Sequence, residues 1–423
     1  MSANADSFDA VVVGGGPAGS AAAIHLASGG ARVLLAEQER FPREKLCGEF
    51  ISPECLTHFA RLGVLEEMSG AGGAQIHETF FYAQSGRGVS VPSEWFSGPR
   101  PAALGLSRAE MDARLLARSR AVGVEVLEGA GLSGLLVEGG RVAGVRLTLE
   151  GGGVREARAR VTVDATGRQR AVARRGEREA RRGAFGPAAR RAASRAGDDP
   201  ARSPLVAFKA HLSGASPRPG VCEIYFYRGG YGGLSEVEGG LANLCFIASA
   251  EDVRARGSDA ERVVREVLMR NRRAAETLSC ARAETRWLGV ALRGFGRYAA
   301  APAPGLLAVG DAAAFIDPFT GSGMLMALES AELAARIIAA WLPAARAGTV
   351  APGPLAREYE RLHAARFGAR LRVCRLLRGA AFAPAPLTEL AVRVFSASRT
   401  LRRGVARATR PRQQSEPREA HGR

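Results

Sequence analysis

The 423-residue sequence contains only two lysines, Lys45 and Lys209, among its 59 basic residues. Arginine therefore supplies nearly all the positive charge behind a formal net charge of +17, a bias that indicates GC-rich coding more than selection for phosphate contacts. The arginines cluster in residues 168–202 and 393–423, without the interleaved aromatic residues or the motif of a nucleic-acid-binding protein. We expect no nucleic-acid partner, and we expect the C-terminal arginines to favour peripheral contact with anionic membrane surfaces.

The sequence also lacks the motifs of several common sites. Its six cysteines include no C-x-x-C pair, its six histidines have no metal-ligand spacing, and no G-x-S-x-G stretch is present. We therefore expect no metal site, no redox dithiol and no serine nucleophile. No apolar run reaches the length of a membrane span, and residues 1–30 carry no basic segment before their apolar run. A cytoplasmic protein without an obligate protein partner is the expectation.

What is present is a glycine-rich stretch near the start, "VVVGGGPAGSAAAIHLASGG", residues 11–30. The apolar residues before it predict a short buried strand, and Gly14, Gly16 and Gly19 have the spacing G-x-G-x-x-G before an alanine-rich helix. Gly14 would supply the tight turn, Gly16 would let a pyrophosphate approach the backbone, and Gly19 would let the helix pack on its strand. The helix N-terminus adds partial positive charge.

A second predicted strand, residues 31–36, ends at Glu37. An acidic residue at this position accepts hydrogen bonds from a ribose in dinucleotide-binding folds. Together with the glycine turn, Glu37 predicts a bound dinucleotide that contains adenine. No second glycine fingerprint is evident for a separate nicotinamide domain.

The middle of the chain alternates between predicted helices and strands. Ser107 and Glu110 form a capping box that opens a helix ending at Gly123. Glycine turns join the short strands that follow, which suggests a small antiparallel ribbon beside the main sheet. Residues 170–203 lose all periodicity and predict a loop or mobile insertion.

The second half of the chain begins with alternating apolar and polar residues over 205–249, which predict antiparallel strands followed by a helix near 259–271. A buried strand at 306–309 and a long apolar helix from Gly323 to Trp341 then return to the first domain. The segment beyond is helical and basic.

Three separated stretches, the glycine turn, "VDATGRQR" and "VGDAAAFIDPFTGSG", resemble those of the FAD-dependent oxidoreductases in the class A monooxygenase and geranylgeranyl reductase group. The resemblance implies that Asp311 binds the ribityl chain, and that the loop 318–323 lies at the flavin ring. It also implies a helix N-terminus aimed at the flavin N1 and C2 carbonyl, where it stabilises negative charge. The cofactor-binding residues implied by motif and resemblance together are Gly14, Gly16, Ala18, Gly19, Glu37, Arg108, Asp164, Gly167, Asp311, Gly321, Ser322 and Gly323.

The loop "FPREKLCGEF", residues 41–50, is similar to the K-x-C-G stretch that covers the flavin in the reductase branch of this group. Lys45 is one of two lysines in an arginine-rich chain, which hints at a need for an ammonium there. Cys47 would tune the flavin or contact substrate, although a small buried hydrophobe is an equal alternative. The predicted catalytic residues are Lys45, Cys47 and Pro318.

The resemblance predicts an α/β fold: a Rossmann-like FAD-binding domain with an inserted antiparallel-sheet substrate domain and a helical C-terminus. The predicted boundaries are 1–75, 100–175 and 285–345 for the FAD domain, 76–99 and 200–284 for the substrate domain, and 346–423 for the C-terminal helices and basic tail. The substrate sheet departs from the reductase branch at one place, because Gly233 stands where that branch usually has tryptophan.

Three functions remain open. The first is an FAD-dependent monooxygenase that uses NAD(P)H and O2 to hydroxylate or epoxidise a hydrophobic aromatic or prenylated secondary metabolite. The second is a reductase that saturates isoprenoid double bonds, and the third is a flavin-binding or membrane-surface module without turnover. Both enzymes imply a hydrophobic small-molecule substrate, and we expect its pocket to include Phe208, Tyr225 and Tyr227, while His211 is expected to pack in the core.

Overall fold

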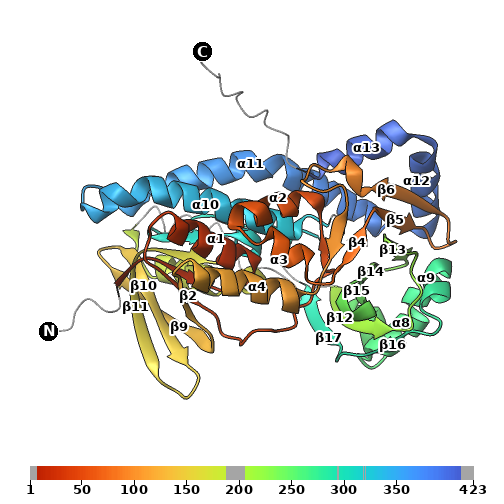
Figure 1. Ribbon diagram of the computed structural model, residues 1–423, viewed down its shortest axis with the longest axis horizontal. Helices are drawn as coiled ribbons and strands as arrows, with labels where there is room; N and C mark the ends of the chain where they lie inside the picture. The colour runs from red at the N-terminus through yellow and green to blue at the C-terminus, as the bar shows by residue number, and fades with distance from the viewer. Residues whose placement is uncertain (1–6, 187–204, 293–294, 318, 320, 411–423) are drawn as a thin grey trace, which may run out of the picture.

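The computed structural model describes residues 7–186, 205–292, 295–317, 319 and 321–410. Two large sheets lie toward opposite ends of an elongated molecule, and long helices run beside them (Figure 1). This arrangement confirms the predicted α/β class with a second, largely antiparallel sheet and a helical C-terminus.

The first sheet has seven strands in the order β8-β2-β1-β11-β10-β9, with β19 also paired to β11. The strands β8, β2, β1, β11 and β19 are parallel, whereas β10 and β9 are antiparallel additions. The predicted antiparallel ribbon is present as β9, β10 and the start of β11, and it is continuous with the main sheet because β11 pairs with β1 at its C-terminal end and with β10 at its N-terminal end. The strands are β1 (Ser7–Val13), β2 (Val33–Ala36), β8 (Glu125–Leu127), β9 (Ala130–Glu138), β10 (Arg141–Leu149), β11 (Val154–Asp164) and β19 (Leu306–Ala308).

Helices cover this sheet and enclose its apolar core. The glycine-started helix α1 packs against α10 and α4, and the aliphatic side chains of β1 and β2 are fully buried beneath them. The helices of this half are α1 (Pro17–Ser28), α2 (Pro53–Leu62), α3 (Leu65–Ser69), α4 (Arg108–Ala121), α5 (Ala171–Arg181), α10 (Gly323–Arg346) and α11 (Pro352–Ala381).

Two local predictions need correction. Residues 171–181 form helix α5, so the predicted loop over 170–203 is wrong there, and residues 187–204 lie outside the described part. The Ser107 hydroxyl does cap α4 by accepting from the Glu110 N–H, but the backbone N–H of Ser107 donates to Glu238 from the second sheet. The capping interaction thus ties the two halves together.

The second sheet has eight strands in the order β16-β12-β15-β14-β13-β5-β6, with β17 also paired to β12. All pairings are antiparallel except β13 with β5, which joins the early segment around residue 80 to the later strands. The strands are β5 (Glu78–Tyr82), β6 (Gly88–Pro92), β12 (Leu205–Ser213), β13 (Val221–Tyr227), β14 (Gly230–Glu236), β15 (Ala242–Ser249), β16 (Arg282–Ala283) and β17 (Leu288–Leu292).

Short helices cover the outer face of this sheet, and the single helix expected near 259–271 is instead α8 followed by a 3-10 turn, Leu268–Arg270, after which α9 begins. These helices are α7 (Ala250–Ala255), α8 (Ala260–Glu266) and α9 (Arg272–Thr277). Two small sheets connect the halves: β3 (Phe50–Ile51), β4 (Ala74–Ile76) and β7 (Ala103–Gly105), and separately β18 (Gly296–Arg297) and β20 (Ala314–Phe315).

The C-terminal helices span both halves. Helix α11 runs along α10, and α12 (Ala385–Ala397) and α13 (Arg399–Ala408) then lie against β6 at the far end of the second sheet (Figure 1). Val392 of α12 packs with Ala83 and Val89 from the segment around β5 and β6. The chain end therefore closes over the substrate half.

Candidate cofactor and substrate site

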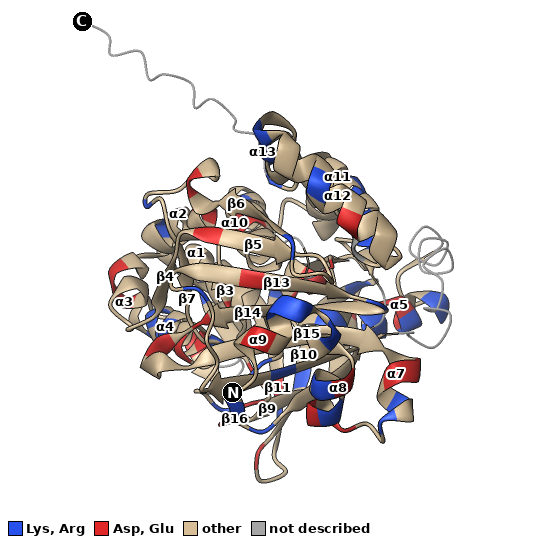
Figure 2. Cartoon of the chain, turned by 90° about the vertical axis from the view of Figure 1, so that its right-hand side faces the viewer, with Lys and Arg blue, Asp and Glu red and all other residues tan. Residues whose placement is uncertain are grey.

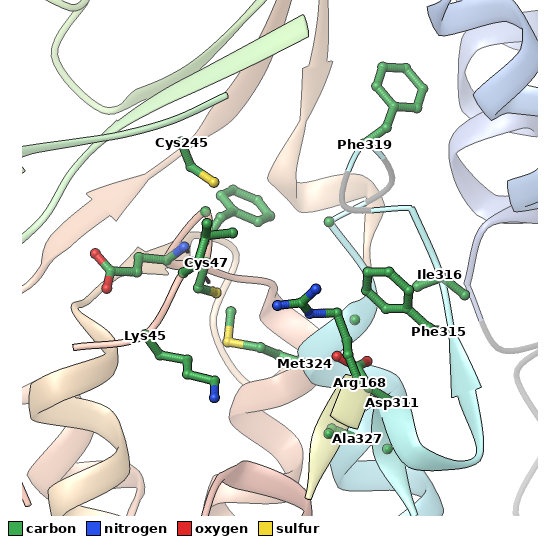
Figure 3. A pocket seen from close by; sticks show the side chains of 18 of the residues that line it. Lys45, Cys47, Arg168, Cys245, Asp311, Phe315, Ile316, Phe319, Met324 and Ala327 are labelled. Carbon is green, nitrogen blue, oxygen red and sulfur yellow. Dashed lines mark hydrogen bonds between the residues drawn. The ribbon is translucent and has the colours of Figure 1, made fainter. Parts of the chain in front are cut away.

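A cavity of ≈ 980 Å³ lies between the two sheets. Its walls come from the glycine turn, the loop before β3, the start of α10, the inner face of the second sheet, and α12 with α13 (Figure 3). Of the predicted cofactor-binding residues, those that line it are Gly14, Gly16, Ala18, Glu37, Arg108, Gly167, Asp311, Gly321 and Gly323. Lys45 and Cys47 line it as well.

The glycine turn is shaped by backbone contacts. Gly14 has a φ of +108°, and a Cβ there would lie 2.4 Å from the Ala165 carbonyl oxygen. A Cβ on Gly19 would lie 1.8 Å from the Gly14 carbonyl oxygen, so only glycine allows α1 to approach this closely. Gly16 differs, because the nearest atoms to a Cβ there are guanidinium nitrogens of Arg108 and Arg43, at 3.6 and 3.9 Å.

A fully buried carboxylate holds these two arginines. Asp112 accepts from Arg43 at 3.1 Å and from Arg108 at 2.7 Å, and the Glu37 carboxylate lies 3.8 Å from Arg43, so both guanidinium groups are fixed beside Gly16. Gly16 is also the N-cap of α1 and offers no side-chain cap. A helix N-terminus with two fixed guanidinium groups is a site for a diphosphate. Arg43 is not among the residues predicted from the sequence, although it lies in the loop that carries Lys45.

Glu37 lies at the end of β2 with its carboxylate on the cavity wall. One oxygen accepts from the Gly15 N–H at 2.7 Å and the other from the Glu39 N–H at 3.0 Å. These bonds fix the carboxylate beside the glycine turn, which suits the predicted contact with a ribose hydroxyl.

The other end of the predicted cofactor site is formed by Asp311 and the start of α10. Figure 3 shows Asp311 beside Arg168 on the cavity wall. Burial raises the pKa of Asp311 to about 6, even though Arg168, Arg108 and Lys45 oppose the shift. Helix α10 begins at Gly323, and no described atom lies within 4 Å of where its Cβ would project.

Three of the described predicted residues, Gly19, Asp164 and Ser322, do not line the cavity wall. Gly19 acts behind it, and Ser322 is the N-cap of α10. Asp164 is fully buried, where it accepts from both the N–H and the hydroxyl of Thr166 and from the Ala173 N–H of α5. Asp164 therefore lies beneath the turn and does not line the cavity, so the predicted direct contact between Asp164 and the cofactor is corrected. Pro318 lies outside the described residues.

The loop of residues 43–49 lies between the two halves. Lys45 faces the cavity. Its pKa is lowered mainly by removal from bulk water and further by the positive charges of Arg43 and Arg108. The Cys47 carbonyl accepts from the Asn243 side chain at 3.0 Å, and its sulfur accepts from the Glu49 N–H at 3.4 Å. Burial raises the pKa of the Cys47 thiol, so its sulfur stays protonated near neutral pH.

A buried ionic network fixes this loop from behind. The Glu49 carboxylate, 0% exposed, accepts from Lys209 at 2.8 Å, His211 at 2.6 Å and the Arg108 N–H at 2.8 Å. Lys209 also donates to Glu44. His211 is therefore a hydrogen-bond partner of Glu49 as well as a core residue, and Lys209, the second lysine of the chain, holds the loop that carries the first. Three of these groups, Glu44, Glu49 and His211, come close enough for a metal, but the Lys209 ammonium already supplies the cation.

An aromatic wall completes the cavity on the substrate side. Phe319 lies 5.7 Å from Phe81 and 5.5 Å from both Phe226 and Tyr231, measured between ring centroids. The Tyr231 hydroxyl donates to Asp317, which also pairs with Arg378 of α11 at 3.0 Å. Cys245 and Gly233 line the cavity beside this wall.

The expected pocket residues Phe208, Tyr225 and Tyr227 are not part of this wall. Side chains alternate along a strand, and in β13 the cavity receives Ile224 and Phe226. Tyr225 and Tyr227 point to the opposite face and pack, with Phe208, in the core beneath the short helices. The predicted and the observed cavity-facing residues of β13 thus differ by one position along the strand.

Comparison with known proteins agrees with this geometry. A family model described as an FAD binding domain matches residues 7–350. The chain belongs to this FAD-binding family. It is 30% identical over 338 residues to a menaquinone reductase of Mycobacterium tuberculosis, an alignment that covers 79% of this chain and 77% of that protein. This chain is thus an FAD-dependent oxidoreductase.

Two further similarities are more limited. A 6-methylpretetramide 4-monooxygenase of Streptomyces rimosus is 35% identical over 139 residues, 32% of this chain and 33% of that protein. A structure of a geranylgeranyl bacteriochlorophyll reductase-like protein from Thermoplasma acidophilum superposes with a TM-score of 0.73 at 21% identity, over 95% of this chain and 96% of that one. The latter shows the shared fold.

The residues present fit FAD. The open side of Gly16 between two guanidinium groups suits the diphosphate, and Glu37 suits the adenosine ribose. Asp311 suits the ribityl hydroxyls, and the unobstructed start of α10 suits the ring system.

Proposed function

We propose that this FAD-dependent oxidoreductase saturates a carbon–carbon double bond of an apolar, isoprenoid-containing substrate such as a prenylated quinone, with NAD(P)H as electron donor. The observation that carries the proposal is a protonated thiol, Cys47, held between the predicted flavin site and an aromatic wall. The name of the menaquinone reductase relative supports the substrate class.

Saturation of a double bond requires one hydride and one proton. Bound FAD supplies the hydride in its reduced form. Cys47 holds the proton at its sulfur, the Asn243 side chain fixes the Cys47 carbonyl, and the Glu49 N–H donates to the sulfur itself. Phe81, Phe226 and Phe319 present ring faces and edges to an apolar chain and exclude water from the site.

The test compares two cysteines of one cavity. FAD-loaded protein is mixed anaerobically with NADPH or NADH and a polyprenyl quinone, and product that has gained two hydrogens is measured by mass spectrometry. Cys47→Ser should slow product formation by about a hundredfold, because a serine hydroxyl is a far weaker acid, while NAD(P)H still reduces the flavin.

Cys245→Ser is the matched control, since Cys245 lines the same cavity from β15 without a place in the loop. Its rate should stay within about threefold of the wild type. Equal rates in both variants would remove Cys47 from the chemistry, and absence of any reduced product would reject the reductase.

Gly233 favours a second candidate, insertion of oxygen into an aromatic or prenylated ring. Gly233 lines the cavity at the position where the reductase branch usually has tryptophan, which leaves room for a broader substrate. Oxygen consumption coupled to a product that gains one oxygen atom, with no gain of two hydrogens under anaerobic conditions, would decide for this candidate.

A further inference from the structure

Helix α12 carries apolar residues on two neighbouring faces. Thr388, Ala391, Val392 and Phe395 line the cavity at the spacing of one helix face. Leu387, Leu390 and Val394 point outward and are 55%, 56% and 47% exposed. The polar side of α12 is formed by Glu389, Arg393 and Ser396, so the exposed leucines and valine are an apolar strip that lacks a cover among the described residues.

The same part of the chain carries most of the exposed large aliphatic side chains. Seven large hydrophobic residues are exposed in the described structure, and five of them belong to α11, α12 and α13. We call these five the outer apolar face: Leu376, Leu387, Leu390, Val394 and Leu401. Their concentration at one end of the molecule marks an interaction surface rather than scattered exposure.

Arginines surround the outer apolar face almost without acidic residues. Residues 361–410 contain twelve arginines and one acidic residue, Glu389, which accepts from the N–H and hydroxyl of Ser85. Five of these arginines pair with carboxylates outside this range: Arg361, Arg366, Arg370, Arg378 and Arg410. Figure 2 shows the basic residues on α11, α12 and α13. Arg393, Arg403 and Arg407 are exposed and form no ion pair with any described residue.

We propose that the outer apolar face and its arginines dock this protein on an anionic lipid bilayer. Leucine and valine side chains on one face of a short helix, flanked by uncompensated arginines, suit shallow insertion at the boundary of headgroups and acyl chains. A folded soluble partner would cover the leucines equally well, but it would have to neutralise arginines on three helices at once. None of the described helices is long and apolar enough to cross the bilayer.

Docking through α12 places the cavity next to the lipid. Helix α12 contributes both to the outer apolar face and, through the neighbouring side of the helix, to the cavity wall, so the two lie next to each other. An isoprenoid substrate dissolved in the bilayer then has a short path to the aromatic wall; this last step rests on the proposed function, whereas docking does not.

The experiment measures binding of the full FAD-loaded chain to phosphatidylcholine vesicles with and without about one third phosphatidylglycerol. The wild type should bind the anionic vesicles at least about tenfold more tightly. Leu387→Ser with Leu390→Ser and Val394→Ser should weaken that binding about tenfold, and so should Arg403→Gln with Arg407→Gln.

Matched controls change the same residue types elsewhere. Val154→Ser removes an exposed aliphatic side chain, 62% exposed, at the start of β11, and Arg174→Gln with Arg178→Gln removes two exposed charges from α5. Both should bind vesicles as the wild type does. Loss of binding in the controls, or unchanged binding in both test variants, overturns the proposal.

A second measurement needs no variant. Amide hydrogen exchange in α12 and α13 of the wild type should slow when anionic vesicles are added and stay unchanged with neutral ones. Unchanged exchange in both helices overturns the proposal. So does slowing that depends on protein concentration without lipid, which would assign the face to a second copy of the chain. Turnover is not measured here, so failure of the proposed reaction would leave this result intact.

Discussion

The two ends of the cavity differ in whether backbone atoms or side chains form them. At the nucleotide end the decisive atoms belong to the backbone, where the carbonyl oxygens of Gly14 and Ala165 leave no room for a side chain. At the substrate end they belong to side chains contributed by strands, loops and helices distant in sequence, such as Phe81, Phe226 and Phe319. One end tolerates no added volume, whereas the other can be reshaped one residue at a time.

This difference separates what the cofactor and the substrate demand. A diphosphate is bound by N–H groups and fixed charges, which one strand, one turn and one helix can supply together. An apolar substrate is bound by shape, which needs contributions from many elements. We therefore expect changes at the nucleotide end to cost folding and FAD together, and changes at the substrate end to cost stability or specificity separately.

The largest effect is expected from Gly19→Ala. Its Cβ would lie 1.8 Å from the Gly14 carbonyl oxygen and 3.0 Å from the Ala165 Cβ, and neither can move without disturbing the turn. We expect about 3 kcal/mol or more of lost stability and no retained flavin. Thermal unfolding and the flavin absorbance of the purified protein measure both.

Gly379→Ala is the control, because Gly379 lies within α11 with no described atom near its Cβ position. Alanine there should leave the flavin bound and change stability by less than about 1 kcal/mol, in the stabilising direction. A Gly19→Ala protein that keeps its flavin and melts with the wild type would show that the turn can relax.

The same division explains what could be predicted from the sequence. Backbone constraints leave local marks: Gly14, Gly16 and Gly19 at fixed spacing, with Glu37 at the end of the next strand, predict the strand, the turn and the helix correctly. The long helix from Gly323 and the alternating strands of the second sheet were predictable for the same reason, since their periods are local.

Contacts between side chains that are far apart in the sequence leave no such local pattern. The pairing of Lys209 with Glu49 joins residues 160 positions apart, and nothing in their local sequence announces it. The inward face of β13 depends on register, so the prediction put Tyr225 and Tyr227 in the cavity, where the structure has Ile224 and Phe226. The part of α12 and α13 in the cavity wall follows from how the chain end folds back, although the spacing of Val392 and Phe395 offered a weak helical signal.

The second largest effect is expected from Lys209→Met, at the substrate end. The side chain of Lys209 is 1% exposed, and its removal leaves Glu49 without a cation inside the sheet. Breaking an enclosed pair costs about 3–5 kcal/mol; we expect about 2 kcal/mol because Glu44, 38% exposed, admits water to this network. Urea unfolding of the flavin-free protein measures the loss.

The other lysine provides the comparison. Lys45 faces the cavity and forms no ion pair with any described residue, so Lys45→Met should leave the unfolding midpoint nearly unchanged while altering the flavin spectrum. If both methionine variants unfolded alike, the buried network would not be what holds the loop.

The stabilisation from Lys209 should also depend on pH. Because Glu49 and Glu44 raise the pKa of Lys209 against its burial, this stabilisation should persist from neutral pH until the pH rises through that elevated pKa.

The smallest effect, and the one with two opposite signs, is expected from Asp311→Asn. Burial raises the pKa of Asp311 to about 6 in the protein without flavin, so the carboxylate destabilises that form above this pH and stability falls as pH rises from about 4 to 6. Asparagine should therefore stabilise the flavin-free protein at pH 7.5 by about 1 kcal/mol, after allowance for solvent in the cavity.

If ribityl hydroxyls donate to the Asp311 carboxylate, FAD prefers the ionised form, and the affinity of the wild type for FAD should drop about tenfold between pH 7.5 and 5. The variant should bind FAD more weakly at pH 7.5 and show no such drop, because its amide does not titrate. Fluorescence titration of FAD at the two pH values, beside thermal unfolding without flavin, measures both signs; a variant that retains the pH dependence would place the titrating group elsewhere.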